Sequence, residues 1–120
     1  EVARDLVNLG AELILVPTMT TTGDRSQEQV ISRATSIVQQ CYVVSCNGVG
    51  YGGVGGSIIV DPDGNVLQKS GGSPFLQTAI IDFERVKMLR NQGVAGVSHP
   101  WKDFRKNNQS FEVYNKKTKT

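Results

Sequence analysis

Two cysteines and one histidine are the residues of this chain that could carry nucleophilic chemistry. A cysteine nucleophile needs a base beside it, but Cys41 and Cys46 lie in one apolar segment and His99 follows far along the chain. Free cysteines in apolar strands are usually buried, so we expect both to be structural. Residues five apart in a strand are separated by roughly 16 Å, so both should be free thiols. One histidine with two such cysteines also falls short of a zinc site.

A glycine-rich run and three aspartates are the other candidates for chemistry. Residues 48–53 match the G-x-G-x-x-G pattern that cradles a pyrophosphate, but that pattern needs a helix directly after it. An apolar strand-like segment follows instead, so we interpret the run as a loop whose backbone passes close to other elements. Asp61 and Asp63 occupy a turn containing Pro and Gly, and Asp82 begins a helix. Turn and capping roles are therefore favoured over paired catalytic carboxylates.

The helices and strands that position these residues follow from the spacing of apolar side chains. A helix over residues 1–9 carries Val2, Leu6 and Leu9 on one face and ends at Gly10. An apolar run over 13–16 predicts a strand covered on both faces. A capping box of Ser26 and Gln29 is expected to start a helix that continues to about residue 40. The helical period there is carried by Val30, Ile31, Ala34, Ile37 and Val38.

The rest of the chain favours hairpins over crossovers. A strand over 41–46 is followed by the glycine-rich loop and by strands over 57–60 and 65–68 that flank the Pro-Gly turn. A further strand is predicted over 76–81, and Asp82 caps a short helix. From Gly93 onward, aromatic residues are scattered without a period. This order of elements predicts an α/β fold with a mixed sheet and a C-terminal tail over 93–120.

Composition excludes several functional classes. The 120 residues are 38% hydrophobic and 20% charged, which is ordinary for a globular chain, and the net charge is only +2. The excess charge lies at the C-terminus, around Lys116, Lys117 and Lys119, as in a solvated tail, so we expect no nucleic-acid partner. There is no apolar stretch of membrane-spanning length and no signal peptide, so we expect no membrane partner. Free thiols suit a reducing compartment, so we expect a cytoplasmic protein.

Four motifs in order resemble the carbon–nitrogen hydrolases of the nitrilase superfamily. The helix over 1–6 and the strand over 10–17 are similar to the elements that follow the nucleophilic cysteine in that family. Arg33-Ala34, then the segments 42–44 and 47–50, are similar to its next helix, strand and loop. The segment 56–67 resembles its G-x-S-x-[IV]-x-[DP]-P-x-G hairpin, and residues 81–90 resemble its last strand and helix. The resemblance covers residues 1–92. One departure is the family's R-A-x-E-N motif, whose acid and amide are absent after Arg33-Ala34.

The resemblance implies an α-β-β-α sandwich that cleaves amide, N-carbamoyl or nitrile bonds with a Glu-Lys-Cys triad, without metal or organic cofactor. In family order all three residues precede Glu1, so no catalytic residue is expected within this chain. The helix over 1–9 also lacks an N-cap, so we expect further residues before it. The chain is thus predicted to be the C-terminal half of such an enzyme, inactive alone, with the upstream half and a second copy as partners.

Two other functions compete with this hypothesis. A non-catalytic scaffold or oligomerisation segment would need no triad at all. Half of a nucleotide-binding α/β domain would need a helix after the glycine run, which the sequence does not offer. A preceding segment that ends in a C-x-x-x-R-F-P-like stretch would select the hydrolase.

Residues that could touch a substrate follow the first two predicted strands, because α/β folds bind ligands at the carboxyl ends of strands. Thr18, Met19 and Thr20 follow the first strand, and Asn47 follows the second. The plainer interpretation, equally open, is that the first three are loop surface and Asn47 is a turn residue.

The predicted tail contains two aromatic residues, Trp101 and Phe104, that we expect to pack against other side chains. Aromatic side chains are enriched in interface cores, and the resemblance implies C-terminal segments that cross to a partner subunit. We therefore predict that Trp101 and Phe104 are buried against the body or a second subunit. Residues 116–120 are predicted to be disordered.

Overall fold

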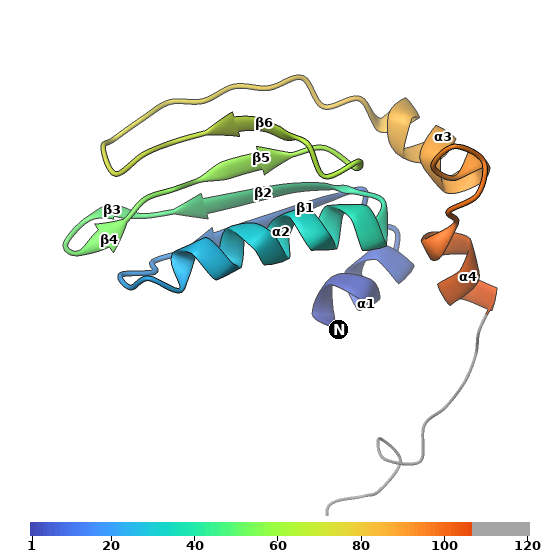
Figure 1. Ribbon diagram of the computed structural model, residues 1–120, viewed down its shortest axis with the longest axis horizontal. Coiled ribbons are helices and arrows are strands. Elements are labelled where there is room, and N and C mark those ends of the chain that lie inside the picture. The colour runs from blue at the N-terminus through green and yellow to red at the C-terminus, as the bar shows by residue number, and fades with distance from the viewer. Residues whose placement is uncertain (107–120) are drawn as a thin grey trace, which may run out of the picture.

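The computed structural model describes residues 1–106, which form a sheet with helices along one face and at one end (Figure 1). The helices are α1 (Val2–Asn8), α2 (Arg25–Gln39), α3 (Phe83–Gln92) and α4 (Pro100–Lys106). The strands are β1 (Leu13–Thr18), β2 (Tyr42–Asn47), β3 (Val49–Gly50), β4 (Gly53–Val54), β5 (Ile58–Val60) and β6 (Val66–Lys69). Within these residues no helix is long and apolar enough to cross a membrane.

The larger sheet has the strand order β1-β2-β5-β6 and contains both strand directions. β1 and β2 are parallel, with Leu13 opposite Tyr42 and Thr18 opposite Asn47, and α2 connects them. β5 is antiparallel to both β2 and β6. The mixed sheet confirms the predicted α/β fold class. It also brings the carboxyl ends of β1 and β2 to the same edge of the sheet.

Helix α2 lies along the sheet (Figure 1). The side of α2 that faces the sheet is polar. The buried residues of α2 are Arg25, Ser32, Ser36 and Gln39, whereas Val30, Ile31, Ile37 and Val38 are exposed. The two serines can be buried because their hydroxyls donate to carbonyls of the same helix, those of Glu28 and Arg33. The apolar period therefore predicted the helix, but the apolar side faces outward in this chain.

The predicted capping box at the start of α2 is wrong. The N-cap residue is Asp24, and its side chain makes no capping hydrogen bond. The Ser26 hydroxyl donates to the Gly23 carbonyl, and the Gln29 amide reaches across to the Gly56 carbonyl. Gln29 is therefore drawn away from the helix start by a contact with a distant loop, which no local pattern reveals.

The core lies between α1, the parallel strands and α4. It consists of Val7, Ile14, Cys41 and Val43, with Ala3, Val16 and Trp101 packed against it. On α1 the buried residue is Val7, whereas Val2, Leu6 and Leu9, which share the predicted apolar face, are exposed. As on α2, the apolar stripe of α1 faces away from the core of this chain.

The prediction that the first strand is covered on both faces is wrong for this chain. Ile14 is buried, but Leu15, the next residue of β1, is 66% exposed. The predicted strand over 76–81 is also not found, because this segment pairs with no strand among the described residues. An alternating apolar pattern predicts an extended backbone, but a strand also needs a hydrogen-bonded neighbour.

The turns and caps of the second half follow the sequence more closely. The Asp61 carboxylate accepts hydrogen bonds from the backbone N–H groups of Asp63 and Asn65, which closes the β5–β6 hairpin. The Asp82 carboxylate accepts from the Glu84 N–H, which confirms the predicted cap of α3. Asp63 forms an ion pair with Arg85, so the aspartates have structural partners. The glycine-rich loop contains the short β3–β4 hairpin, which was not predicted.

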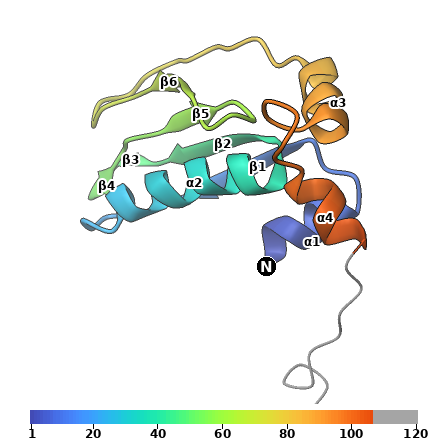
Figure 2. The same cartoon turned by 45° about the vertical axis from the view of Figure 1, so that its right-hand side comes forward.

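Residues 93–106 are more ordered than the predicted tail, because they contain α4 (Figure 2). Trp101 packs on the core, and its backbone N–H donates to the side-chain oxygen of Gln40 at 3.1 Å. Phe104 is 37% exposed and lies under the Arg4 guanidinium, 4.0 Å from its ring centroid. Contact of either ring with a second subunit stays a prediction. The predicted disorder of 116–120 lies outside the described residues.

A buried arginine holds α3 against this end of the sheet. Arg90 is 6% exposed, and its guanidinium donates to the carbonyls of Gln40 at 3.1 Å, Ala11 at 2.9 Å and Gln39 at 3.4 Å. Two of these carbonyls belong to the C-terminal end of α2, which carries partial negative charge. The Trp101 ring lies 5.2 Å from the same guanidinium.

Candidate active-site wall

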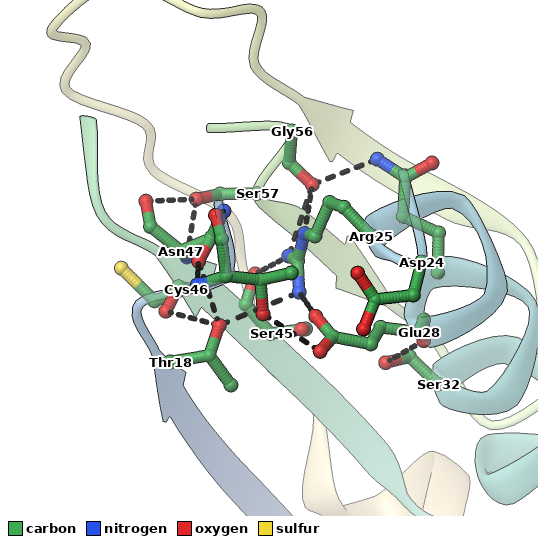
Figure 3. A network of polar contacts seen from close by, with 12 residues as sticks. Thr18, Asp24, Arg25, Glu28, Ser32, Ser45, Cys46, Asn47, Gly56 and Ser57 are labelled. Carbon is green, nitrogen blue, oxygen red and sulfur yellow. Dashed lines mark hydrogen bonds and ion pairs between the residues drawn. The ribbon is translucent and has the colours of Figure 1, made fainter. Parts of the chain in front are cut away.

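The structure brings together residues that the sequence predicted at the carboxyl ends of β1 and β2 (Figure 3). The Thr18 hydroxyl donates to the Asn47 side-chain oxygen at 3.0 Å. The Thr20 N–H donates to the same oxygen at 2.7 Å, and the Asn47 amide donates back to the Thr20 carbonyl at 3.1 Å. The loop after β1 is therefore bound to the last residue of β2.

The Asn47 side chain connects two loops through its hydrogen bonds. Its amide also donates to the Gly55 carbonyl at 2.9 Å, and the residue is buried. A side-chain amide offers two donor hydrogens and two acceptor lone pairs, and all four are used here. Asn47 thus joins the loop after β1 to the glycine-rich loop, and a ligand could bond to its side chain only by displacing one of these contacts.

Met19 covers the start of the glycine-rich loop. Its side chain is half exposed and its sulfur lies so close to Gly48 that a Cβ added there would be 2.2 Å from it. The Gly48 N–H donates to the Thr18 carbonyl at 3.1 Å. A glycine is therefore needed where two backbones and a thioether meet, which agrees with the close backbone approach expected for this loop.

Arg25 and Glu28, which sequence reasoning did not single out, organise the same edge of the sheet (Figure 3). Arg25 is 4% exposed and donates to the carbonyls of Ser45, Gly55 and Gly56 at 3.0–3.2 Å. It also forms an ion pair of 2.7 Å with Glu28. The second oxygen of Glu28 accepts from the Thr20 hydroxyl at 2.7 Å. The sequence could have indicated this ion pair, because an arginine and a glutamate three residues apart on the first helical turn lie on the same side of the helix.

The ionisation of Glu28 follows from these partners. Hydrogen bonds from Arg25 and then from Thr20 hold the pKa of the Glu28 carboxyl below its ordinary value. The side chain is 32% exposed, so it remains partly in contact with solvent although both carboxylate oxygens accept hydrogen bonds. Glu28 is therefore an ionised hydrogen-bond acceptor at neutral pH.

The two cysteines differ in a way that the sequence did not predict. Cys41 is buried, and this burial raises the pKa of its thiol to about 11, which suits the predicted inert role. Cys46 is exposed, so its predicted burial is wrong; it points to the face of β2 opposite that of Ser45. Both are free thiols, as predicted.

His99 contacts the Gly96 carbonyl, and residues 1–106 contain no cluster of metal-ligating side chains.

Two cavities border the cluster, and residues of β2 line both of them. One, of about 290 Å³, is bordered by Val44, Cys46 and Phe75, and none of its described lining residues is charged. The other, of about 220 Å³, lies between α1, α2 and β1 and is bordered by Val43 and Glu28. Ser45 lines both cavities.

The family model for carbon-nitrogen hydrolases matches residues 1–91, which is most of the chain. The fold and this match define the class: the chain belongs to the carbon-nitrogen hydrolase family. Deaminated glutathione amidase of Bos taurus is 35% identical over 99 residues, 77% of this chain and 30% of the amidase. A protein of Staphylococcus lugdunensis named hydrolase in agr operon is 33% identical over 66 residues, 52% of this chain and 28% of that protein. The chain thus spans roughly a third of the length of these curated relatives.

Solved structures share the fold. A carbon-nitrogen hydrolase of Helicobacter pylori superposes with a TM-score of 0.68 at 23% identity, over 94% of this chain and 43% of that chain. A Nesterenkonia amidase of the nitrilase superfamily superposes with a TM-score of 0.57 at 27% identity, over 61% of this chain and 29% of that chain. The mixed sheet and its helices are therefore those of the nitrilase superfamily.

Proposed function

We propose that this chain is the C-terminal half of an enzyme that hydrolyses a non-peptide carbon–nitrogen bond in an amide, an N-carbamoyl compound or a nitrile. The single observation that carries the proposal is the family match over residues 1–91. In the proposed reaction a cysteine thiolate attacks the carbon of the substrate. An amide or N-carbamoyl group then loses ammonia or amine to give the thioester, whereas a nitrile first gives a thioimidate, which reaches the thioester and releases ammonia after water adds. Water then hydrolyses the thioester, with a glutamate as the base and a lysine stabilising the oxyanion.

In this proposal the Glu-Lys-Cys triad lies on a segment that precedes Glu1, and this chain supplies a wall of the substrate pocket. The properties of the two cysteines support that division. The raised pKa of Cys41 opposes thiolate formation, and Cys46 has no hydrogen-bonded base among the described contacts. The wall would be formed by Thr18, Met19, Thr20 and Asn47. The uncharged lining of the cavity beside Cys46 suits a neutral amide or nitrile group.

The partners proposed for this chain are the catalytic half and a second copy of the chain. The apolar side chains left exposed on α1 and α2 support association, because large exposed apolar patches mark interaction surfaces. The open side of β1 at Leu15 supports a further layer. A cytoplasmic location is proposed from the two free thiols.

Ammonia release tests the proposal with propionamide, N-carbamoyl-β-alanine and propionitrile as probes. The full-length protein that contains this chain is expected to turn over at least one of them, whereas the chain over residues 1–120 alone releases none. The double variant Cys41→Ser/Cys46→Ser of the full-length protein is the control, and it should keep its activity. Turnover by the isolated chain that disappears in Cys46→Ala would show that the nucleophile lies here and would overturn the proposed division.

A further inference from the structure

Five hydrogen bonds close a ring at the carboxyl ends of β1 and β2. Its members Arg25, Glu28 and Asn47 are labelled in Figure 3. The Gly55 carbonyl accepts from both Arg25 and Asn47, at 3.2 and 2.9 Å. Arg25 donates to one oxygen of Glu28, and Thr20 donates to the other, each at 2.7 Å. The Thr20 N–H closes the circle on the Asn47 oxygen at 2.7 Å. We call these five residues, Thr20, Arg25, Glu28, Asn47 and Gly55, the Glu28 ring.

The Glu28 ring joins three segments that are separate in sequence. Thr20 belongs to the loop after β1, Arg25 and Glu28 to the first turns of α2, and Asn47 and Gly55 to the two ends of the glycine-rich loop. Glu28 is the member that spans from the helix to the loop after β1. Its carboxylate holds both partners at once, because one oxygen accepts from Arg25 and the other accepts from Thr20.

Backbone conformation at Gly55 keeps the ring closed at its other end. Gly55 has a φ of +66°, and a Cβ there would lie 2.2 Å from the Gly71 carbonyl oxygen. The Gly55 N–H donates to the Gly48 carbonyl, so the two ends of the glycine-rich loop are also bound to each other. The ring therefore rests on a backbone that has little freedom to shift.

We propose that Glu28 is a positioning residue: through the ring it holds Thr18 at the end of β1, and Met19 and Thr20 in the loop that follows, in their substrate-binding position. This role rests on the proposed function of the chain. Glu28 itself is assigned no contact with the substrate, because both of its oxygens are already bound within the ring. Its effect is on the position of the loop, so it should influence substrate binding rather than the chemical step, whose residues lie on the other half.

Substitutions at Glu28 test this role in the full-length protein with the best of the three ammonia-releasing probes. Glu28→Leu removes both acceptors and is expected to raise KM on the order of tenfold with kcat within about twofold, because positioning errors weaken binding. Glu28→Gln can still accept from Arg25 and donate to the Thr20 hydroxyl, so it should restore KM to near the wild-type value. Glu28→Asp is a second disrupting variant that keeps the charge but is too short to reach both partners.

The matched control is Glu84→Leu, which removes another glutamate that pairs with a basic residue three positions away, on α3 and outside the ring. It should leave KM and kcat unchanged. A fall in kcat with unchanged KM for both Glu28→Leu and Glu28→Asp would indicate lost folded protein and would overturn the positioning role. Unchanged kinetics in both would overturn it as well. A wild-type protein that turns over no probe would instead refute the proposed function, and this role with it.

Discussion

A buried arginine lies at each end of this sheet, and the positive charges of the two arginines are stabilised by different groups. At the carboxyl ends of β1 and β2, Arg25 pairs with Glu28 and shares its carbonyl partners with other donors. At the opposite end, Arg90 donates to carbonyls alone, and the described residues include no ion-pair partner for it. Burial is the main cause that lowers the pKa of Arg90, as expected when a cation leaves water.

The comparison shows two ways to stabilise a buried guanidinium. Arg90 fixes α3 against the body by donating to the carbonyls of Gln39 and Gln40 at the end of α2. Carbonyls at a helix end have no partner within the helix, so the guanidinium satisfies acceptors that would otherwise have no donor. A carboxylate is present where loops have to be gathered, because its second oxygen can bind a further segment. Glu28 uses that oxygen for Thr20, which connects the helix to the loop after β1.

The largest effect is expected from Arg90→Met. The carbonyls of Ala11, Gln39 and Gln40 would lose their charged donor in a buried setting, and the contact of Arg90 with Trp101 would also be lost. We expect unfolding free energy to fall by about 3 kcal/mol. Urea unfolding followed by circular dichroism measures it. A decrease in the free energy of unfolding below about 1 kcal/mol would contradict this expectation, because it would mean that water satisfies the three carbonyls as well as the guanidinium does.

Arg25→Met should cost less, about 2 kcal/mol, since its partners keep other contacts. The Gly55 carbonyl still accepts from Asn47 and the Gly56 carbonyl from Gln29, while the partly exposed Glu28 regains water. The same unfolding measurement applies, with Arg33→Met as the control variant, because Arg33 of α2 makes a single hydrogen bond, to the Gly64 carbonyl at 2.9 Å, and should cost less still. Equal or larger destabilisation than in Arg90→Met would contradict the proposed difference between the two ends.

The smallest expected effect concerns the pH dependence of stability that the Glu28 carboxylate contributes. The folded pKa of Glu28 lies below its ordinary value of 4.5, so the contribution of the carboxylate is fully present above about pH 4.5. It is lost as the pH falls through the lowered folded value. The urea midpoint of the wild type should therefore approach that of Glu28→Gln as the pH is lowered from 6 to well below 4.5. A gap between the two that stays constant over this range would show that the charge contributes nothing.

The cluster of Thr18, Thr20 and Asn47 could be predicted because it depends on topology alone. Two strands joined by a helix are parallel, and their carboxyl ends meet at one edge. The hairpin over 58–69 and the cap at Asp82 were also predictable, because Pro, Gly and Asp act on their own backbone within a few residues. Arg25 could not be assigned its role in this way, because its carbonyl partners lie 20–31 residues away.

The amino-acid sequence by itself determined the family and the mixed character of the sheet, since these rest on short-range periods and on motifs in sequence order. Only the tertiary structure decided which side of each helix is buried. The apolar period of α2 is real, yet Ser32 and Ser36 face the sheet and Val30 and Ile31 face outward. A period specifies that side chains share a face, but the neighbour of that face is set by the rest of the fold. The buried side of α2 is set by Arg25, whose guanidinium must reach the carbonyls of Ser45, Gly55 and Gly56.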